Sequence, residues 1–510
     1  MVARGVSGGG EGTMGTTRMV RRRRPGVAVL LALGVIGLAL AIVAGRPGPG
    51  PVLTTIAVGS FSGAASISVD EGAGRAYVVA YSGGGSSGRA VVRVLDTTRA
   101  TVVRTTALPG QPFGVTTVAV DARRGRAYTA STGSTSCSSS GGGPQTCTTT
   151  TGAAVVVLDA RTGQPLHTLA VDAGRGMAID GRTGLLYALP TAGGTPSGGP
   201  PISGGGTTRV TVIDPRTGRV VRTIALPGGG QGFGFGTLAI DARGGRLVVV
   251  RTFASGFGGS GTPPSAMDVV ALADGQLLRH VPLPGARFVP FASLLIDESR
   301  ERAFFIASAG VSTLDPRRGT LVRVTPTGGG VGTLVEDART GHVFTTTLGP
   351  LRVVAMGARN SAARTQVPAG DGSLRMLDAR SGALLRSVPI GPLTTGVAVD
   401  ERRGRVYVLS VGFADARGGL TRPGTLNVVD ERSGQIVRTL VVGAVPATLA
   451  LDRRHDRLLV GCYGAVGGTA DDPWGWVPGP VRRLLPFLPR PPAPTSTPQG
   501  SVMILDTTRL

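Results

Sequence analysis

Short apolar runs that end in aspartate recur along the chain from residue 52 to its end. One copy reads Thr237-Leu-Ala-Ile-Asp241, turns through Ala-Arg-Gly-Gly, and resumes as Arg246-Leu-Val-Val-Val. The copy before it reads Val210-Thr-Val-Ile-Asp214 and turns through Pro-Arg-Thr-Gly into another apolar run. Runs of this length, rich in β-branched side chains and bounded by Asp, Pro and Gly, are typical of β-strands joined in hairpins.

The aspartates form two alternating series that divide the chain into eight units. The first series is Asp70, Asp121, Asp180, Asp241, Asp297, Asp337, Asp400 and Asp452. The second is Asp96, Asp159, Asp214, Asp274, Asp315, Asp378, Asp430 and Asp506. Each unit predicts four strands, A to D in chain order, and four strands in roughly 40–60 residues indicate a blade of a β-propeller. We therefore expect an all-β propeller of eight four-stranded blades. Seven blades are the alternative, because the unit from Asp297 to Asp315 is short and the half around Asp274 is weak.

The two ends of the repeat region predict how the ring closes. The chain ends with Ser501-Val-Met-Ile-Leu-Asp506, which supplies a third strand for the last unit but no fourth. The missing strand is present at the other end, where Leu53-Thr-Thr-Ile-Ala-Val-Gly59 matches the fourth strands of other units. We expect this N-terminal strand to complete the C-terminal blade, which leaves no open end between blades.

The segment before the repeats predicts a membrane anchor. Residues 1–24 are polar and end in four arginines, and residues 25–45 carry no charge. As a helix the uncharged segment is about 32 Å long, enough to cross a bilayer. The preceding arginines place the N-terminus in the cytoplasm, and the Pro/Gly linker 46–51 and the propeller 52–510 outside the cell membrane. The alternative is a signal peptide cleaved near Ala39-Leu40-Ala41, which would secrete the remaining chain.

The net charge is +23, and arginine supplies the basic residues. One interpretation is attraction to an anionic partner such as lipid head groups, nucleic acid or polysaccharide. The other, which we favour, is that the arginines occupy the repeated turns and are spread around the molecule. We expect no nucleic-acid partner, because no arginine cluster is interleaved with aromatic residues.

The repeated Asp and Gly residues predict turns rather than catalysis. Asp at the start of a tight turn accepts N–H groups two residues on, and Gly supplies the positive φ that closes it. His167 and His280 fall in D strands, His342 follows an A–B turn and His455 lies inside one. We therefore expect no catalytic residue, metal site or cofactor.

The three cysteines exclude a disulfide framework. Cys137 and Cys147 bracket a Ser/Gly loop and are a possible disulfide in an oxidising compartment. Cys462 lies on an apolar run and is expected to be buried.

Variation in length is confined to the connections between strands B and C. Because strands alternate in direction, these loops share one face with the D–A connectors, and the tight turns share the other. Insertions gathered on one face are typical of the binding side of a repeat protein. We expect the candidate binding face to include Phe113, Phe233, Phe235, Phe288 and Phe291 of the connectors, and Trp474, Trp476, Arg482 and Arg483 of the Pro/Trp-rich insertion 464–500.

The repeat resembles the YVTN-type β-propeller of exported and surface bacterial proteins. The likeness rests on runs such as Val397-Ala-Val-Asp400, Arg405-Val-Tyr-Val408 and the Asp-x-x-Thr-Gly turn, and covers about residues 52–510. It implies an extracytoplasmic propeller without shared catalytic residues. We expect a membrane-anchored binding module for an unknown protein, polysaccharide or small ligand. The alternatives are a propeller-based lactonase, lyase or quinone-dependent dehydrogenase, and a structural component of the cell envelope.

Overall fold

The computed structural model describes residues 50–59, 67–82, 89–109, 118–131, 134–138, 146–151, 153–173, 176–190, 208–227, 234–253, 265–283, 286, 293–327, 331–355, 364–368, 370–411, 424–464 and 500–510. Residues 51–510 form one compact unit. The predicted segments 1–24 and 25–45 lie outside the described residues. Within the described part, no helix has the length and apolarity needed to cross a membrane.

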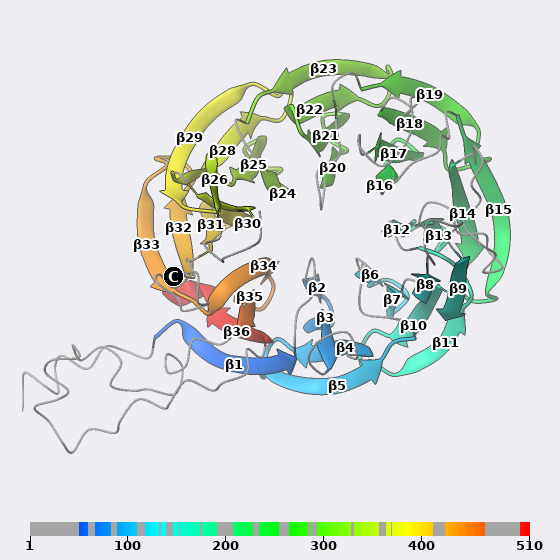
Figure 1. The fold of residues 1–510 in the computed structure, drawn as a ribbon, viewed down its shortest axis with the longest axis horizontal. Helices are drawn as coiled ribbons and strands as arrows, with labels where there is room; N and C mark the ends of the chain where they lie inside the picture. The colour runs from blue at the N-terminus through cyan, green and yellow to red at the C-terminus, as the bar shows by residue number, and fades with distance from the viewer. Residues whose placement is uncertain are drawn as a thin grey trace, which may run out of the picture. The chain divides into compact units, whose positions relative to one another are not determined.

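The compact unit is an eight-bladed β-propeller, as predicted (Figure 1). Each blade is a four-stranded antiparallel sheet whose strand A lies nearest the centre. The strands A to D of blades 1–4 are β2 (Ile67–Asp70), β3 (Arg75–Ser82), β4 (Arg89–Asp96) and β5 (Thr101–Ala107); β6 (Val118–Asp121), β7 (Arg126–Ser131), β10 (Ala154–Asp159) and β11 (Pro165–Leu169); β12 (Gly176–Ile179), β13 (Leu186–Leu189), β14 (Thr208–Asp214) and β15 (Arg219–Leu226); and β16 (Gly234–Asp241), β17 (Arg246–Phe253), β18 (Ala266–Ala271) and β19 (Leu277–Pro282).

Blades 5–8 follow the same order. They consist of β20 (Leu294–Asp297), β21 (Arg302–Ala307), β22 (Gly310–Asp315) and β23 (Thr320–Thr325); β24 (Val331–Asp337), β25 (His342–Thr347), β28 (Gly372–Asp378) and β29 (Leu384–Gly391); β30 (Thr394–Asp400), β31 (Arg405–Ser410), β32 (Thr425–Asp430) and β33 (Ile436–Val441); and β34 (Ala444–Asp452), β35 (Arg457–Gly464), β36 (Gly500–Asp506) and β1 (Val52–Gly59). A short 3-10 helix, Thr507–Arg509, follows β36.

The ring closes through its N-terminal strand, as the sequence predicts. Strand β1 pairs antiparallel with β36, and Ile56 lies opposite Val502. The amide of Asp506 donates to the carbonyl of Pro51 at 2.7 Å, so the chain enters the propeller beside its own C-terminus. The innermost strands then contact one another in an unbroken circle from β2 through β34 and back to β2.

The hydrophobic core lies between blades. The described residues form eight buried apolar clusters, and each cluster joins two neighbouring blades. Tyr77 of strand β3 packs in the first cluster, and its hydroxyl donates to the carbonyl of Ala160 in blade 2 at 2.5 Å. The tyrosine of the repeat therefore both fills an interface and satisfies a turn carbonyl of the next blade.

The aspartates close turns, as predicted. Asp96, for example, accepts the amides of Thr98 and Arg99 at 3.0 and 2.8 Å. One assignment was wrong: Asp274 lies within its turn, and Ala271 occupies the position that aspartate holds elsewhere, since the Gly275 amide donates to the Ala271 carbonyl. Backbone bonds between Ala271 and the end of the turn close it, Asp274 accepts the amide of Gln276 at 2.9 Å, and the weak sequence half is still a complete pair of strands.

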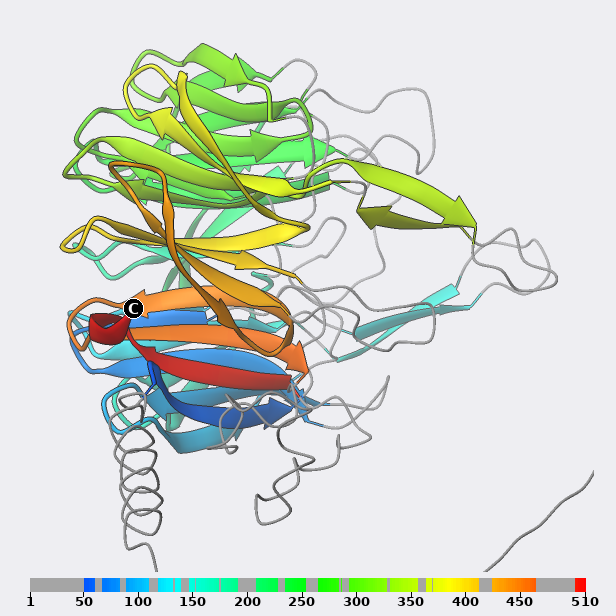
Figure 2. The ribbon, with the colours of Figure 1, turned by 90° about the vertical axis from the view of Figure 1, so that its left-hand side faces the viewer.

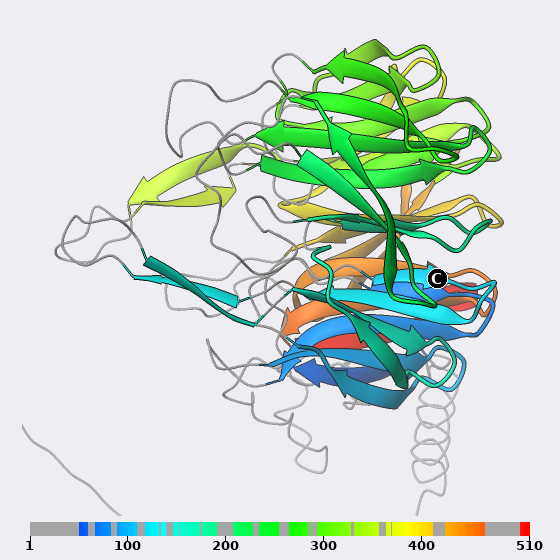
Figure 3. The same ribbon diagram turned by 90° about the vertical axis from the view of Figure 1, so that its right-hand side faces the viewer.

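Two segments predicted as B–C loops contain further strands. Strands β8 (Ser134–Ser138) and β9 (Thr146–Thr151) form one hairpin, and β26 (Leu351–Ala355) and β27 (Arg364–Pro368) form the other. Both project from the loop face, on the side away from the C-terminus (Figures 2 and 3).

Every D strand carries a β-bulge at the same place, which is just after the C–D turn in blades 1–7 and near the start of β1 in blade 8. The extra residue is always an exposed aliphatic side chain, and between 36% and 51% of it is accessible to solvent. We call these eight residues the bulge belt: Leu53, Val103, Leu166, Val221, Leu278, Val322, Leu385 and Val437. The bulge twists an outer edge strand away from regular pairing, which protects it against joining another sheet.

In several blades the residue after the bulge hydrogen-bonds to a backbone carbonyl of the next blade. Arg386 of β29 donates to the carbonyl of Arg432 at 2.9 Å, and Arg222 of β15 donates to that of Leu272 at 3.3 Å. His167 takes this position in blade 2, where its Nε2 lies 2.6 Å from the carbonyl of Pro215. The outer rim is therefore joined from blade to blade by side chains over the C–D turns.

Glycine at the end of these turns leaves space for that contact. Gly434 has a φ of +72°, and a Cβ there would lie 2.7 Å from Arg386 Cδ. Gly404, in the A–B turn of the same blade, has a φ of +59°, and a Cβ there would have nothing within 4 Å. Substitutions at Gly404 and Gly434 therefore separate the cost of backbone strain from the cost of losing the contact between blades.

We expect Gly404→Ala to lower the free energy of unfolding by about 1 kcal/mol, from left-handed strain alone. Gly434→Ala should cost about 1 kcal/mol more, because the methyl group displaces the Arg386 guanidinium from its carbonyl. Denaturant unfolding of both variants measures the difference. In an Arg386→Ala background that difference should vanish, and equal costs in the parent background would contradict the account.

Candidate functional site

Most predicted binding-face residues lie outside the described part of the chain. These are Phe113, Phe233, Phe288, Phe291, Trp474, Trp476, Arg482 and Arg483. Phe235 is the exception: we expected it in a connector, but β16 begins at Gly234, so Phe235 belongs to strand A and lies opposite Thr252. The predicted role of this face remains a prediction.

The cysteines lie where the sequence suggests. Cys137 of β8 is directly opposite Cys147 of β9 in the hairpin register, and the disulfide between them remains a prediction. Cys462 is buried and free, and burial raises the pKa of its thiol to about 12. That thiol stays protonated at neutral pH and has little nucleophilic character.

Three of the four histidines contact carboxylates. His280 lies 2.7 Å from Asp268, His342 lies 2.9 Å from Glu431, and His455 lies 2.9 Å from Asp452. Asp268 is also bound by Arg251 at 2.6 Å, and both of these side chains are buried. Among the described residues no group of His, Cys, Asp and Glu could hold a metal ion.

A groove lies between blades 6 and 7 on the tight-turn face. It has a volume of about 800 Å³. Its walls are the A–B turns of both blades, the C–D turn of blade 7 and the start of β29. Five arginines line it: Arg339, Arg386, Arg402, Arg403 and Arg432. The sequence analysis did not predict a site on this face.

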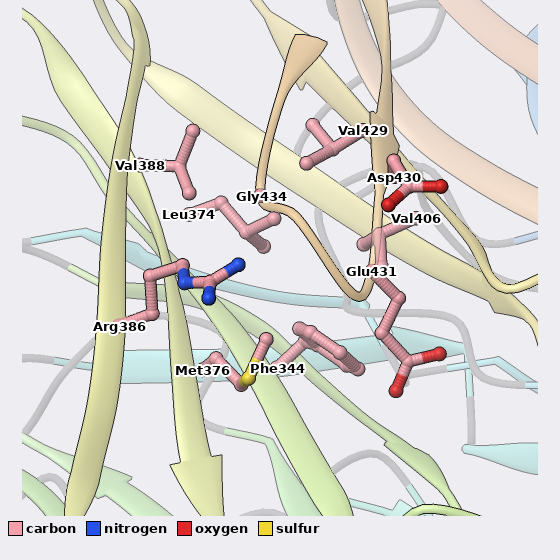
Figure 4. Close-up of a pocket in the computed structure, with 10 residues that line it drawn as sticks. All are labelled: Phe344, Leu374, Met376, Arg386, Val388, Val406, Val429, Asp430, Glu431 and Gly434. Atoms are coloured by element: carbon pink, nitrogen blue, oxygen red, sulfur yellow. The ribbon is translucent and has the colours of Figure 1, made fainter. Parts of the chain in front are cut away.

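An apolar gap of about 10 Å³ adjoins the groove. Figure 4 shows Phe344, Leu374 and Met376 from blade 6 facing Val406 and Val429 from blade 7. Arg386 and Glu431 lie at its edge. A space of this size holds at most one water molecule, so the gap belongs to the core between blades.

Glu431 connects the two walls of the groove. It is only 4% exposed. Its Oε1 accepts from Thr340 Oγ1 at 2.7 Å and lies 2.9 Å from His342 Nδ1, both in blade 6. Its Oε2 has no hydrogen bond among the described residues, and the Nη2 of Arg339 is 3.7 Å away. A buried carboxylate with one unsatisfied oxygen is costly unless a cation compensates it, which Arg339 does in part.

Asp337 lies beneath Glu431 and is fully buried. Burial would raise the pKa of Asp337, but the amide of Thr340, the contact with Glu431 and the charge and amide of Arg339 together lower it. The carboxylate of Asp337 is therefore ionised within the turn.

A second carboxyl pair lies between blades 5 and 6. Arg300 Nη1 is 3.1 Å from both Asp297 and Glu336. Burial, and then the negative charge of Asp297, raise the pKa of Glu336 to about 8. Because the pair shares one arginine, Glu336 is largely protonated at neutral pH and Asp297 carries the charge.

Both unusual acids could have been found in the sequence, because both interrupt the repeat. The residue before the first-series aspartate is apolar in every other unit, as in Val69 and Val399, and is Glu336 in the sixth. The residue after the second-series aspartate is Pro, Ala or Thr in most units, and is Glu431 in the seventh. Their partners come from other blades, so repeat alignment reveals the exceptions but not the groove.

The tight-turn face as a whole is rich in arginines without carboxylate partners. The aspartates that begin the A–B turns are buried. Within the described residues, seven exposed turn arginines have no carboxylate oxygen within 4.0 Å, and we call them the unpaired turn arginines: Arg123, Arg161, Arg182, Arg243, Arg380, Arg432 and Arg454. These arginines belong to six of the eight blades, and the same turns carry most of the chain's carboxylates.

Comparisons with known proteins support the fold and no closer relationship. A europium-containing methanol dehydrogenase has a TM-score of 0.53 and 11% identity, over 89% of this chain and 93% of that one. The C-terminal WD40 domain of Sif2 has a TM-score of 0.50 and 10% identity, over 90% and 99%. BamB from Moraxella catarrhalis has a TM-score of 0.43 and 12% identity, over 81% and 97%. No family model and no curated protein sequence matches this chain. At these identities the first two likenesses show the propeller fold alone.

The raised pKa of Glu336 predicts a pH-dependent stability. Its folded pKa of about 8 lies above the ordinary value of 4.5, so its contribution to stability is present at low pH and is lost as pH rises from about 4.5 to 8. We expect Glu336→Gln to raise the melting temperature relative to the parent progressively across that range. Glu301→Gln, at a half-exposed carboxylate 3.4 Å from Arg317, is the control and should give a constant offset. If the melting temperatures of Glu336→Gln and the parent run parallel across this pH range, the pKa of Glu336 is not raised in the folded protein.

Proposed function

We propose that this chain is an exported propeller of the YVTN-repeat type that residues 25–45 hold at the cell membrane. In this proposal the loop face binds an extracytoplasmic protein, polysaccharide or small ligand. The observation that carries it is the division of the two faces. The tight turns hold nearly constant length, whereas every long insertion joins strands B and C and emerges on the opposite side.

The two projecting hairpins support a binding role for the loop face. Hairpins β8–β9 and β26–β27 extend a surface of inserted segments without adding to the ring of blades (Figures 2 and 3). An inserted segment can change in length and sequence to suit a binding partner without disturbing the blades. The Pro/Trp-rich insertion 464–500 belongs to the same series of B–C connections and is the longest of them.

An anchor at residues 25–45 predicts how the protein behaves in membranes. In cells expressing the full chain, we expect it to stay in the membrane fraction after an alkaline carbonate wash. Protease added from the extracytoplasmic side should degrade the propeller and leave a small N-terminal fragment. Release by carbonate of a chain shortened to begin near Ala41 would instead establish the cleaved signal peptide.

A ligand screen separates a binding module from an enzyme on the same scaffold. Thermal unfolding of the full chain in detergent should show no stabilisation by divalent ions or by a pyrroloquinoline quinone cofactor. A sugar or cell-envelope polysaccharide that stabilises it would identify the ligand class. Stabilisation by a quinone or a metal ion would favour the dehydrogenase alternative and overturn the proposed role.

A further inference from the structure

Hairpin β8–β9 has an unusual composition. Every residue of its two strands is serine, threonine or cysteine, because β8 reads Ser-Thr-Ser-Cys-Ser and β9 reads Thr-Cys-Thr-Thr-Thr-Thr. The other projecting hairpin, β26–β27, has one hydroxyl residue, Thr365, and includes leucine, valine and arginine. No charged residue occurs between Arg126 and Asp159. The hydroxyl content is therefore a property of this insertion and not of projecting hairpins in general.

The register of the hairpin gathers hydroxyl residues on one face. Successive residues of a strand lie on opposite faces of a sheet. Cys137 and Cys147 are directly opposite each other and so share one face of the hairpin. The other face consists of two adjacent cross-strand pairs, and we call these four residues the hydroxyl face: Ser136 opposite Thr148, and Ser138 opposite Thr146. The Cβ atoms of such a pair are about 5 Å apart, so the four residues form a compact patch.

Neither packing nor solubility explains this composition. A two-stranded ribbon is marginally stable in water unless a hydrophobic face packs on a neighbour, and this hairpin has no apolar residue for such a face. It forms a sheet of its own and pairs with no other described strand. Its edges are therefore open to strand addition, which proteins commonly prevent with charged residues or proline. The two strands contain neither.

We infer that the hydroxyl face is a site of O-glycosylation, where hexoses are attached to the serine and threonine oxygens. This inference rests on the proposed function, because the sugars are added to the exported chain. Segments rich in serine and threonine with a nearby proline are typical acceptors, and Pro144 lies between the two strands in the sequence. Attached sugars are bulky and solubilising, so they would cover the open edges of the ribbon.

The donor is a sugar joined through its anomeric carbon to a lipid phosphate, and a separate transferase brings it to the hairpin. The serine or threonine oxygen attacks the anomeric carbon, and the bond from that carbon to the phosphate oxygen breaks as the new C–O bond forms. The hydroxyl proton passes to a base of the transferase, and the lipid phosphate leaves. The acceptor must be reachable from outside, which a hairpin that projects beyond the ring provides (Figures 2 and 3).

Mass spectrometry of the full chain, purified from the cells that naturally produce it, tests the inference directly. We expect an intact mass above that of the sequence by whole multiples of one hexose. Trypsin cleaves after Arg126 and Arg161, so a single peptide, 127–161, contains the whole hairpin. Fragmentation that preserves the glycosidic bond should place hexose on the hydroxyl face. An unmodified peptide, or sugar attached only outside the hydroxyl face, would overturn the inference.

Two variants test the assignment to one face. The hydroxyl-face variant combines Ser136→Ala, Ser138→Ala, Thr146→Val and Thr148→Val, and valine keeps the β-branched shape that suits a strand. We expect at least a several-fold loss of hexose on peptide 127–161. The matched control on the cysteine face combines Thr135→Val and Thr149→Val and should retain the hexose. Both should keep the melting temperature of the parent, because the ring of blades does not include this hairpin. Equal losses of hexose in the two variants would contradict the assignment.

Failure of glycosylation can be distinguished from failure of export. If protease added from the extracytoplasmic side degrades the propeller and the hairpin is unmodified, the glycosylation is wrong and the proposed export stands. If the propeller resists the protease in intact cells and the hairpin is unmodified, both are wrong.

Discussion

Each blade can bury its apolar surface only against the next blade, and this constraint governs the whole structure. The eight buried clusters lie between blades, so a blade without two neighbours would expose one side of its sheet. Only a closed ring gives every blade a neighbour on both sides and so forms all eight buried clusters. The closing strand comes from the opposite end of the repeat region, and its pairing with β36 makes the two ends of the propeller mutually dependent.

The turn residues serve this closure more than they serve any chemistry. Aspartate and glycine shape each turn, tyrosine and arginine reach from one blade to the carbonyls of the next, and glycine leaves the space that this contact needs. Because four strands per blade return the chain to the same side, all these turns share a face. That face therefore carries both the arginines that join the blades and the carboxylates that close the turns.

The sequence was sufficient for the fold and insufficient for the groove. The aspartate spacing predicted eight blades, strand order and the closing strand, because each depends on contacts within one unit or on a visibly missing element. The short fifth unit and the weak fourth one both form complete blades, since backbone hydrogen bonds replace the aspartate at Ala271. The bulge belt, the hairpins β8–β9 and β26–β27, and the pairing of Glu431 with Thr340 and His342 were not predicted. These features depend on register and on neighbours about 90 residues away, which a repeat pattern does not encode.

The central claim is that the chain forms a ring of eight blades closed by β1, with the constant turns on one face and the inserted segments on the other. The most direct measurement is a cryo-electron microscopy reconstruction of the full chain. The account predicts eight blades, with β1 as the fourth strand of the last one and with hairpins β8–β9 and β26–β27 projecting from the face opposite the C-terminus. A ring of seven blades, an unpaired β36, or hairpins on the same face as the C-terminus would contradict it.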